Sequence, residues 1–224
     1  MSDGSPDVTP EMDLSQQIEQ LHALYKVVDH RHALSILRAN YPIELGELLS
    51  ALLSFRLTDG MLTAPGGNES KIPKLFSSCL RPHGWRETRI TGDLLVSLKA
   101  KRIEGKGIDE SRFKISSYLD GHKIDYVKGD VAFDLEWNAK DQTFDRDLYA
   151  MRAFYEANVI AAGVLVTRSV ELNKEFQRLG IMQKYGASTT WLGKLIPRLE
   201  ANRGGGCPIL ALGMTSRLLH NEQE

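Results

Sequence analysis

The chain has 224 residues, of which 42% are hydrophobic and 25% charged, which is enough apolar sequence for one large domain with a core. No apolar run reaches the ~18 residues of a membrane span, and the acidic, polar start is unlike a secretory signal. The net charge of -1 does not indicate a nucleic-acid binder. It does not exclude one, because acids at both ends can offset a more basic middle.

Cys79 and Cys207 are the only cysteines. Two isolated thiols without CxxC spacing argue against a structural zinc site and against a disulfide framework. Reduced, partly buried thiols are typical of a cytoplasmic protein, so we expect a cytoplasmic location and no membrane partner.

The first eighty residues read as helical. Apolar residues follow three- and four-residue steps over 11–40, which predicts a helix. After Pro42 a leucine-rich segment predicts a second helix, a glycine-containing loop follows, and residues 72–80 predict a third helix.

From residue 85 the pattern changes to strands. Short, partly alternating runs bounded by glycine predict strands over 85–103, 112–120, 122–128 and 130–138, with turns at "GHK" and "KGD". Beyond them the chain predicts a helix over 143–159 capped by Thr143, a strand over 160–168, helices over 170–180 and 190–202, and a last strand over 204–214. The whole is an α/β fold, a mixed central sheet with helices on both sides.

The stretch "HKIDYVKGDVAFDLEWNAK" places three carboxylates among apolar residues. With a period of two, Asp134 and Glu136 share one face of a strand while their apolar neighbours point to the core. A hairpin at "KGD" would bring Asp125 beside them. Alternating acids on a strand are usually a solvated face, but the strongly apolar flanking segments favour a central position here. Gathered carboxylates repel, and a divalent cation such as Mg²⁺ offsets this best.

These residues resemble a known family. "IDYVKGDVAFDLEWN", followed by a long helix and the strand "IAAGVLVTR", is similar to the type II restriction endonucleases of the BglII and BstYI group, within the PD-(D/E)XK nuclease superfamily. Further resemblance lies in "IPKLFSSCLRPHGWRETR" and in "WLGKLIPRLEANRGGGCPILALGM", so it covers roughly residues 45–215. The motif is short, and the order of the flanking elements adds specificity.

The resemblance assigns roles to these positions. Asp125, Asp134 and the carbonyl of Leu135 would hold Mg²⁺, and Asp125, Asp134 and Glu136 would be catalytic. Glu136 stands where the family usually has Lys, as in BamHI-type enzymes, and would orient or deprotonate the attacking water. An alternative register uses Asp125, Glu136 and Asn138. Possible accessory residues, each with an ordinary surface role as the alternative, are Glu69, Lys128 and Asn138.

The resemblance also implies DNA contact after the active strand. Asn138, Lys140 and Asp141 could reach base edges, although an ordinary loop is the alternative. Ser188 and Thr189 could contact DNA or cap the next helix. Arg203 and the adjacent glycine amides could hold a phosphate or simply form a turn.

We therefore expect a type II restriction endonuclease that cleaves double-stranded DNA with Mg²⁺ and leaves 5′-phosphates. Residues 13–216 would form one catalytic and DNA-binding domain, with a helical part over 13–80 and a nuclease core over 81–216. A disordered lead (1–12) and a tail (217–224) would flank it. A homodimer would match a palindromic site, with a methyltransferase in the same system. The alternatives are a non-catalytic relic that binds DNA and a structure-specific repair nuclease.

Overall fold

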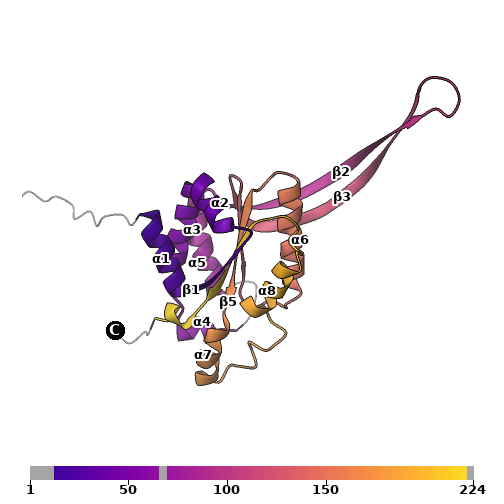
Figure 1. Ribbon diagram of the computed structural model, residues 1–224. Helices are drawn as coiled ribbons and strands as arrows, with labels where there is room; N and C mark the ends of the chain where they lie inside the picture. The colour runs from indigo at the N-terminus through magenta and orange to yellow at the C-terminus, as the bar shows by residue number, and fades with distance from the viewer. Residues whose placement is uncertain (1–12, 66–69, 221–224) are drawn as a thin grey trace, which may run out of the picture.

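The computed structural model describes residues 13–65 and 70–220. It has the three layers expected of an α/β protein, with one group of helices on each face of a central sheet (Figure 1). The predicted lead (1–12), Glu69 and residues 221–224 lie outside the described residues. The mixed sheet flanked by helices confirms the predicted fold class.

The sheet has six strands in the order β1-β6-β5-β4-β3-β2. The three central strands, β4 (Val131–Glu136), β5 (Ala162–Arg168) and β6 (Ile209–Met214), are parallel to one another. The outer strands β1 (Tyr25–His30), β2 (Arg86–Lys101) and β3 (Ile108–Lys128) pair antiparallel to their neighbours. Every residue of the central strands is buried, as the continuous apolar sequences of β5 and β6 predict.

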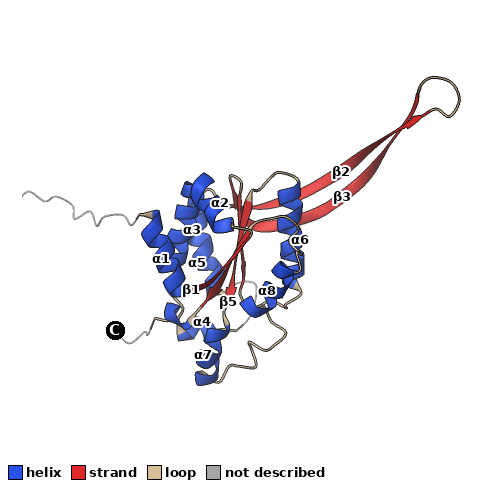
Figure 2. Ribbon diagram, in the orientation of Figure 1, coloured by secondary structure: helices blue, strands red, loops and turns tan. Residues whose placement is uncertain are grey.

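One face of the sheet is covered by the N-terminal helices, and α6 and α8 cover the other (Figure 2). The first group consists of α1 (Leu14–Leu24), α2 (Ala33–Asn40), α3 (Pro42–Ser54), α4 (Asp59–Thr63) and α5 (Lys71–Leu80). The remaining helices are α6 (Thr143–Glu156), α7 (Asn173–Arg178), α8 (Leu192–Glu200) and the short turns η1 (Arg81–His83), η2 (Val170–Leu172) and η3 (Ser216–Leu218).

The continuous helix predicted over 11–40 is wrong, because β1 interrupts it. The segment "YKVVDH" pairs residue by residue with β6 at the edge of the sheet. Its valines favour a strand, and the buried Tyr25 hydroxyl donates a 2.8 Å hydrogen bond to the carbonyl of Leu52. Tertiary pairing therefore overrides the helical period of the surrounding sequence.

The turn predicted at "GHK" is also wrong. Residues 112–128 form one strand, in which Gly121 has φ 71° and lies at a register shift. The left-handed backbone is what favours glycine at this bulge, because the atom nearest to an added Cβ, 2.2 Å away, belongs to the end of the flexible Arg89 side chain and can move. β2 and β3 instead form one long ribbon that turns over residues 102–107 and projects from the body (Figures 1 and 2). The "KGD" turn is confirmed: Gly129 has φ 51° and joins β3 to β4.

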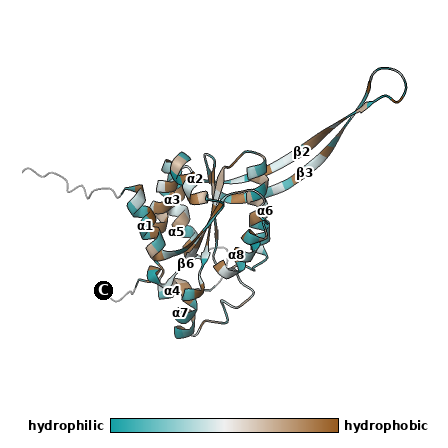
Figure 3. Cartoon of the chain, viewed as in Figure 1, coloured by the Kyte–Doolittle hydropathy of each residue, from teal (hydrophilic) through white to brown (hydrophobic). Residues whose placement is uncertain are grey.

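Two hydrophobic clusters fill the spaces between the layers. The larger lies under α1 to α5 and includes Phe133 and Leu135 of β4 and Trp137 just beyond it, as the alternation predicts. The smaller lies under α6 and α8 and includes Ala132 on the opposite face of the same strand. Figure 3 shows hydrophobic and hydrophilic residues interleaved along the helices that flank the sheet, as expected of helices with one buried face.

Within residues 13–65 and 70–220, no helix is both long and apolar enough to cross a bilayer.

The described part of the predicted tail packs on the body, since Leu218 is buried and the His220 amide donates a hydrogen bond to the carbonyl of Leu57.

Gly163 sets how closely α6 approaches the sheet. A Cβ on this residue of β5 would lie 2.7 Å from the sulfur of Met151 on α6. We expect Gly163→Val to lower the free energy of unfolding by about 1–3 kcal/mol through overpacking, measured by urea denaturation. Gly46→Ala is the matched control, because nothing lies within 4 Å of its added methyl, and a helix interior gains up to ~1 kcal/mol from alanine. Equal stability of Gly163→Val and wild type would contradict this account.

Candidate active site

The hairpin of β3 and β4 gathers the three predicted carboxylates on one face of the sheet. Tyr126 pairs with Phe133, so the next residues outward, Asp125 and Asp134, stand side by side. Their carboxyl groups interact, and Glu136 also acts on Asp134. Asp134 and Glu136 are only 5% and 9% exposed, whereas Asp125 is exposed at the rim. The structure therefore brings the three acids together, and their role as an active site stays a prediction.

A fourth carboxylate comes from α6. Asp147 is 2% exposed and acts electrostatically on both Asp134 and Glu136. The sequence analysis missed it. The helical spacing could have indicated that Asp147 is buried, because it lies three residues after Phe144 and four before Met151, on the face of the helix that packs on the sheet.

Burial is the main cause that raises the pKa of the three buried acids, Asp134, Glu136 and Asp147. It raises the pKa of Asp134 well above its ordinary value, and the charges of Asp147, Asp125 and Glu136 add to the effect. Burial, then the charge of Asp147, raise the pKa of Glu136 to about 8. Burial also raises the pKa of Asp147, opposed by the guanidinium of Arg146.

Arg146 is the one cation that contacts this group among the described residues. Its guanidinium lies 3.4 Å from a Glu136 oxygen and 3.0 Å from a carboxylate oxygen of Asp147. Its side chain is 69% exposed, so one solvated charge faces four acids. The positive charge beside the four acids is therefore too small to neutralise all of them when they are ionised.

The donor set fits a hard divalent cation. Carboxylate oxygens are the ligands that magnesium and calcium prefer, and the buried Oδ2 of Asp147 has no hydrogen-bond partner in the described structure. Within residues 13–65 and 70–220, no three His, Cys, Asp or Glu side chains are already arranged as a metal-binding group. The acids are close enough to shift one another's pKa, and the side chains would have to turn toward a shared ion.

Leu135 and Lys128, both assigned to the site from the sequence, have side chains that do not face the carboxylates. The side chain of Leu135 points into the opposite cluster, so only its backbone can take part in the site. Lys128 faces away from the carboxylates: its ammonium lies 2.5 Å from Glu47 of α3. The accessory role expected for Lys128 is therefore not supported by its position.

Asn138 stands at the end of the active strand beside a small pocket. Its amide nitrogen donates a 3.3 Å hydrogen bond to the carbonyl of Lys184, while its Oδ1 is buried without a partner in the described residues. The pocket has a volume of about 170 Å³ and is lined by both residues together with Glu136. A polar group that enters it could reach Asn138 and a catalytic candidate together.

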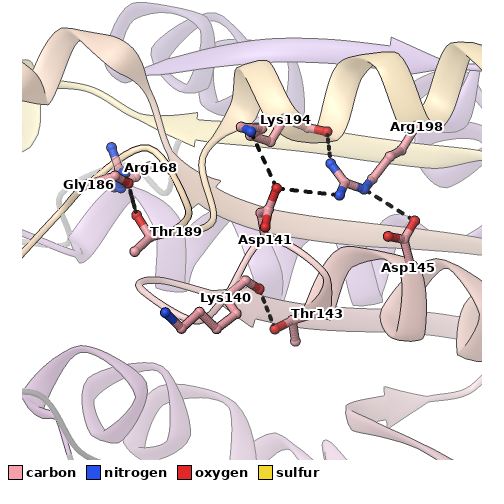
Figure 4. Close-up of polar contacts among 9 residues, drawn as sticks. All are labelled: Lys140, Asp141, Thr143, Asp145, Arg168, Gly186, Thr189, Lys194 and Arg198. Carbon is pink, nitrogen blue, oxygen red and sulfur yellow. Dashed lines mark hydrogen bonds and ion pairs between the residues drawn. The ribbon is translucent and has the colours of Figure 1, made fainter.

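The two loops predicted to contact DNA are joined to each other. Lys140 forms an isolated antiparallel bridge with Thr189, and the amide of Asp141 donates a 2.9 Å hydrogen bond to the carbonyl of Ser188. Lys140 and Ser188 are exposed. Segments 138–142 and 183–190, separate in sequence, thus form one surface (Figure 4). We call it the paired-loop surface.

Ion pairs occupy Asp141 and Arg203. The Asp141 carboxylate lies 3.4 Å from Lys194 and 3.6 Å from Arg198 (Figure 4), and Arg203 pairs with Asp145, as Arg198 does. The side chain of Arg203 is still 53% exposed. Asp141 thus fixes basic residues of α8 and is not directed outward.

Both predicted helix caps are wrong. Ser188 is not the cap of α8, because Trp191 holds that position. Thr143 is the first residue of α6, and its hydroxyl donates a 2.6 Å hydrogen bond to the carbonyl of Lys140. Both residues instead belong to the junction of the two loops.

Arg168, at the end of β5, supports the paired-loop surface from beneath and was not anticipated. It is 2% exposed. Its guanidinium donates to the Tyr185 carbonyl at 3.1 Å and to the Thr189 hydroxyl at 2.7 Å, and it lies over the rings of Phe176 and Tyr185. No carboxylate within residues 13–65 and 70–220 forms an ion pair with it, and burial lowers its pKa to about 10.

The comparison with known proteins agrees with this architecture. A mixed sheet flanked by helices is consistent with a restriction-endonuclease fold. Residues 25–214 match the family described as restriction endonuclease BglII/BglIII. The chain therefore belongs to this family of nucleases. No curated protein matches the chain.

The raised carboxyl pKa values predict how stability depends on pH in the presence of a chelator. The folded-state pKa of Glu136 is about 8, against an ordinary value of 4.5. Its protonated form therefore stabilises the fold fully below pH ~4.5, and this contribution is lost as the pH rises toward 8. We expect the unfolding free energy to fall between pH 5 and 8, measured by urea denaturation in EDTA.

Glu136→Gln should reduce that slope, because glutamine does not titrate. Glu104→Gln, at the exposed turn of the β2–β3 ribbon, is the control and should leave the slope unchanged. A Glu136→Gln protein with the wild-type pH dependence would contradict the assignment.

Arg168→Met should loosen the paired-loop surface. The change removes two hydrogen bonds from a charged donor, each worth ~1.5–3 kcal/mol in favourable cases, so amide exchange over 185–190 should accelerate by at least about tenfold. Hydrogen exchange with mass spectrometry measures this. Arg178→Met is the control, since Arg178 is exposed and pairs with Asp59 and Glu175. Unchanged exchange in the loop would refute the supporting role of Arg168.

Proposed function

We propose that the protein is a type II restriction endonuclease that uses Mg²⁺ to cleave double-stranded DNA at a specific sequence and leaves 5′-phosphates. The observation that carries this proposal is the convergence of Asp125, Asp134, Glu136 and Asp147 in a family of restriction endonucleases. Buried acids with so little compensating charge are costly for a fold. A cation and a phosphodiester would account for them.

Asp125, Asp134 and the backbone carbonyl of Leu135 would hold the cation, and Asp147 lies close enough to complete the set. When bound, Mg²⁺ supplies charge stabilisation for the pentavalent transition state and lowers the pKa of bound water. Asp134 is fixed by its backbone, since the Leu135 amide donates a 3.0 Å hydrogen bond to its Oδ1. Asp125 at the exposed rim is then the acid nearest to an arriving strand.

Glu136 would orient the attacking water and accept its proton. Burial raises the pKa of Glu136 to about 8, so the side chain would act as a proton acceptor at neutral pH only once the positive charge of a bound cation favours its ionised form. Arg146 lies 3.4 Å away and can hold the side chain in place. Attack in line on phosphorus expels the 3′ oxygen and leaves the phosphate on the 5′ side. In the alternative register Asp125 and Glu136 would be the two acids, and Asn138 would take the third position as an amide.

The paired-loop surface is the candidate for reading DNA. Exposed Lys140 and Ser188 are available for base or phosphate contact, and Asn138 offers an amide of the kind that pairs with adenine. Thr189 is half-buried, and its hydroxyl would have to leave Arg168 and Gly186 to contact DNA. Arg203 can reach a phosphate while it remains near Asp145. Asp141 would act indirectly, by positioning Lys194 and Arg198.

A homodimer would place two such sites across a palindrome, and a methyltransferase in the same system would protect the host's own sites. A non-catalytic relic is the second candidate. It is favoured by one observation: Glu136 replaces the usual Lys, and Lys128 is engaged by Glu47 instead. A structure-specific repair nuclease is the milder alternative.

Plasmid cleavage tests the proposal. With Mg²⁺ we expect discrete fragments from wild type and none in EDTA. Asp125→Asn and Asp134→Asn should each lower cleavage at least about 10³-fold, and Glu136→Gln at least about 10²-fold, as expected for groups at the reacting phosphate. Asp130→Asn, at the exposed turn of the same hairpin, is the control and should cleave like wild type.

The other outcomes separate the alternatives. A smear or a cut confined to branched DNA indicates the repair nuclease, and binding without any cut indicates the relic. Full activity of Asp134→Asn would refute the assigned site.

A further inference from the structure

Arg146 of α6 lies between the buried carboxylates and the solvent. Its Nε and Nη2 donate hydrogen bonds to Oδ1 of Asp147 at 3.1 and 3.0 Å, and Nη2 also lies 3.4 Å from Oε1 of Glu136. Both acids are buried, whereas the side chain of Arg146 is 69% exposed. The guanidinium is therefore held by the acids on one edge and open to solvent on the other.

The solvent edge of this guanidinium still has hydrogen-bond donors to offer. An arginine side chain carries five N–H donors in a planar fork, and within residues 13–65 and 70–220 the Nη1 of Arg146 makes no hydrogen bond. Two parallel N–H groups of a guanidinium match two oxygens of a phosphate. The edge formed by Nη1 and Nη2 thus has the shape for a bidentate contact with a phosphodiester.

Stability of the fold does not account for a cation at this position. Arg146 lies in the first turn of α6, which begins at Thr143, and there the helix dipole favours negative charge over positive charge. An ion pair with one well-solvated member also contributes little to stability. Its place at the mouth of the acid group is better explained by a negatively charged group that arrives from solvent.

Other basic groups near this end of the sheet are already engaged. Lys128 is paired with Glu47, and the basic residues of α8 are paired with Asp141 and Asp145. Position 136, where the family usually has Lys, carries an acid. Of the cations in the described residues, Arg146 alone contacts the carboxylates, so it is the side chain that can offer positive charge to a phosphate beside them.

We propose that Arg146 is a catalytic residue whose free guanidinium edge binds the non-bridging oxygens of the scissile phosphate. The inference rests on the proposed function and names the side chain that supplies the positive charge absent at position 136. As water attacks phosphorus and the bond to the 3′ oxygen breaks, negative charge grows on the non-bridging oxygens, and donors fixed in advance stabilise it most in the transition state. Arg146 keeps its proton throughout, because a guanidinium does not deprotonate in proteins.

Single-turnover plasmid cleavage with Mg²⁺ at saturating protein tests this contact. Arg146→Met should lower the rate constant at least about 10²-fold, the loss usual when one preorganised donor is removed. Arg146→Lys keeps the charge without the fork and should cleave at least about tenfold faster than Arg146→Met. Arg152→Met is the matched control, since Arg152 is an exposed arginine of the same helix that pairs with Glu156, and it should cleave like wild type.

DNA binding in EDTA gives a second measurement, which needs neither the metal nor cleavage. Each phosphate contact contributes ~0.9 to the slope of log K against log salt concentration, so Arg146→Met should lower that slope by about one per active site. Arg146→Lys and Arg152→Met should retain the wild-type slope. A role confined to holding Glu136 in place would leave the slope of Arg146→Met unchanged, and that result overturns the proposal even if cleavage is lost.

Arg146→Gln is a second variant in case methionine disturbs the fold. Its amide can still donate a hydrogen bond to Asp147, but it carries no charge, so it should lose both the cleavage rate and the salt slope as Arg146→Met does. A wild-type cleavage rate in either neutral variant overturns the proposal.

Plasmid cleavage by wild type separates this inference from the proposed function. If wild type cuts into discrete fragments and Arg146→Met cuts at the same rate, the catalytic role of Arg146 fails alone. If wild type cuts nothing with Mg²⁺, the proposed function fails and the role of Arg146 fails with it.

Discussion

The crowding of carboxylates between β4 and α6 is the constraint on which the rest of the structure depends. Asp134 and Glu136 lie on one face of β4, and the larger apolar cluster covers the other face. α6 brings Asp147 against them, and Gly163 gives α6 the space to come close. The low exposure that makes these acids costly also makes their charge effective, because water screens them poorly.

The sequence was most informative where side-chain alternation and chain order decide the structure. The period of two in "DVAFDLEWN" was sufficient to separate the acids from Phe133, Leu135 and Trp137, and the "KGD" turn was sufficient to bring Asp125 to Asp134. β5 and β6 come from continuous, mostly apolar runs, so their burial was also predictable. These features depend on local pattern alone.

Other features depend on contacts between distant segments. β1 resembles a helix by period and becomes a strand because β6 offers it an edge. Asp147 looks like one of several acids on an amphipathic helix until α6 is docked. Arg168 ends a buried strand, and its role follows from loop 185–189 folding back over it. Gly121 signals a turn by composition, yet the surrounding strand pairing makes it a bulge.

Under the proposed function, the bridge between Lys140 and Thr189 has a consequence for how the specificity for DNA can change. Because the backbone of one loop is hydrogen-bonded to the other, a residue inserted or removed in either segment displaces both. Single substitutions that need backbone movement would therefore disturb contacts on two sides of a DNA site together. Variants with altered specificity should carry compensating changes in both loops, because the effect of a substitution in one loop depends on the residues present in the other.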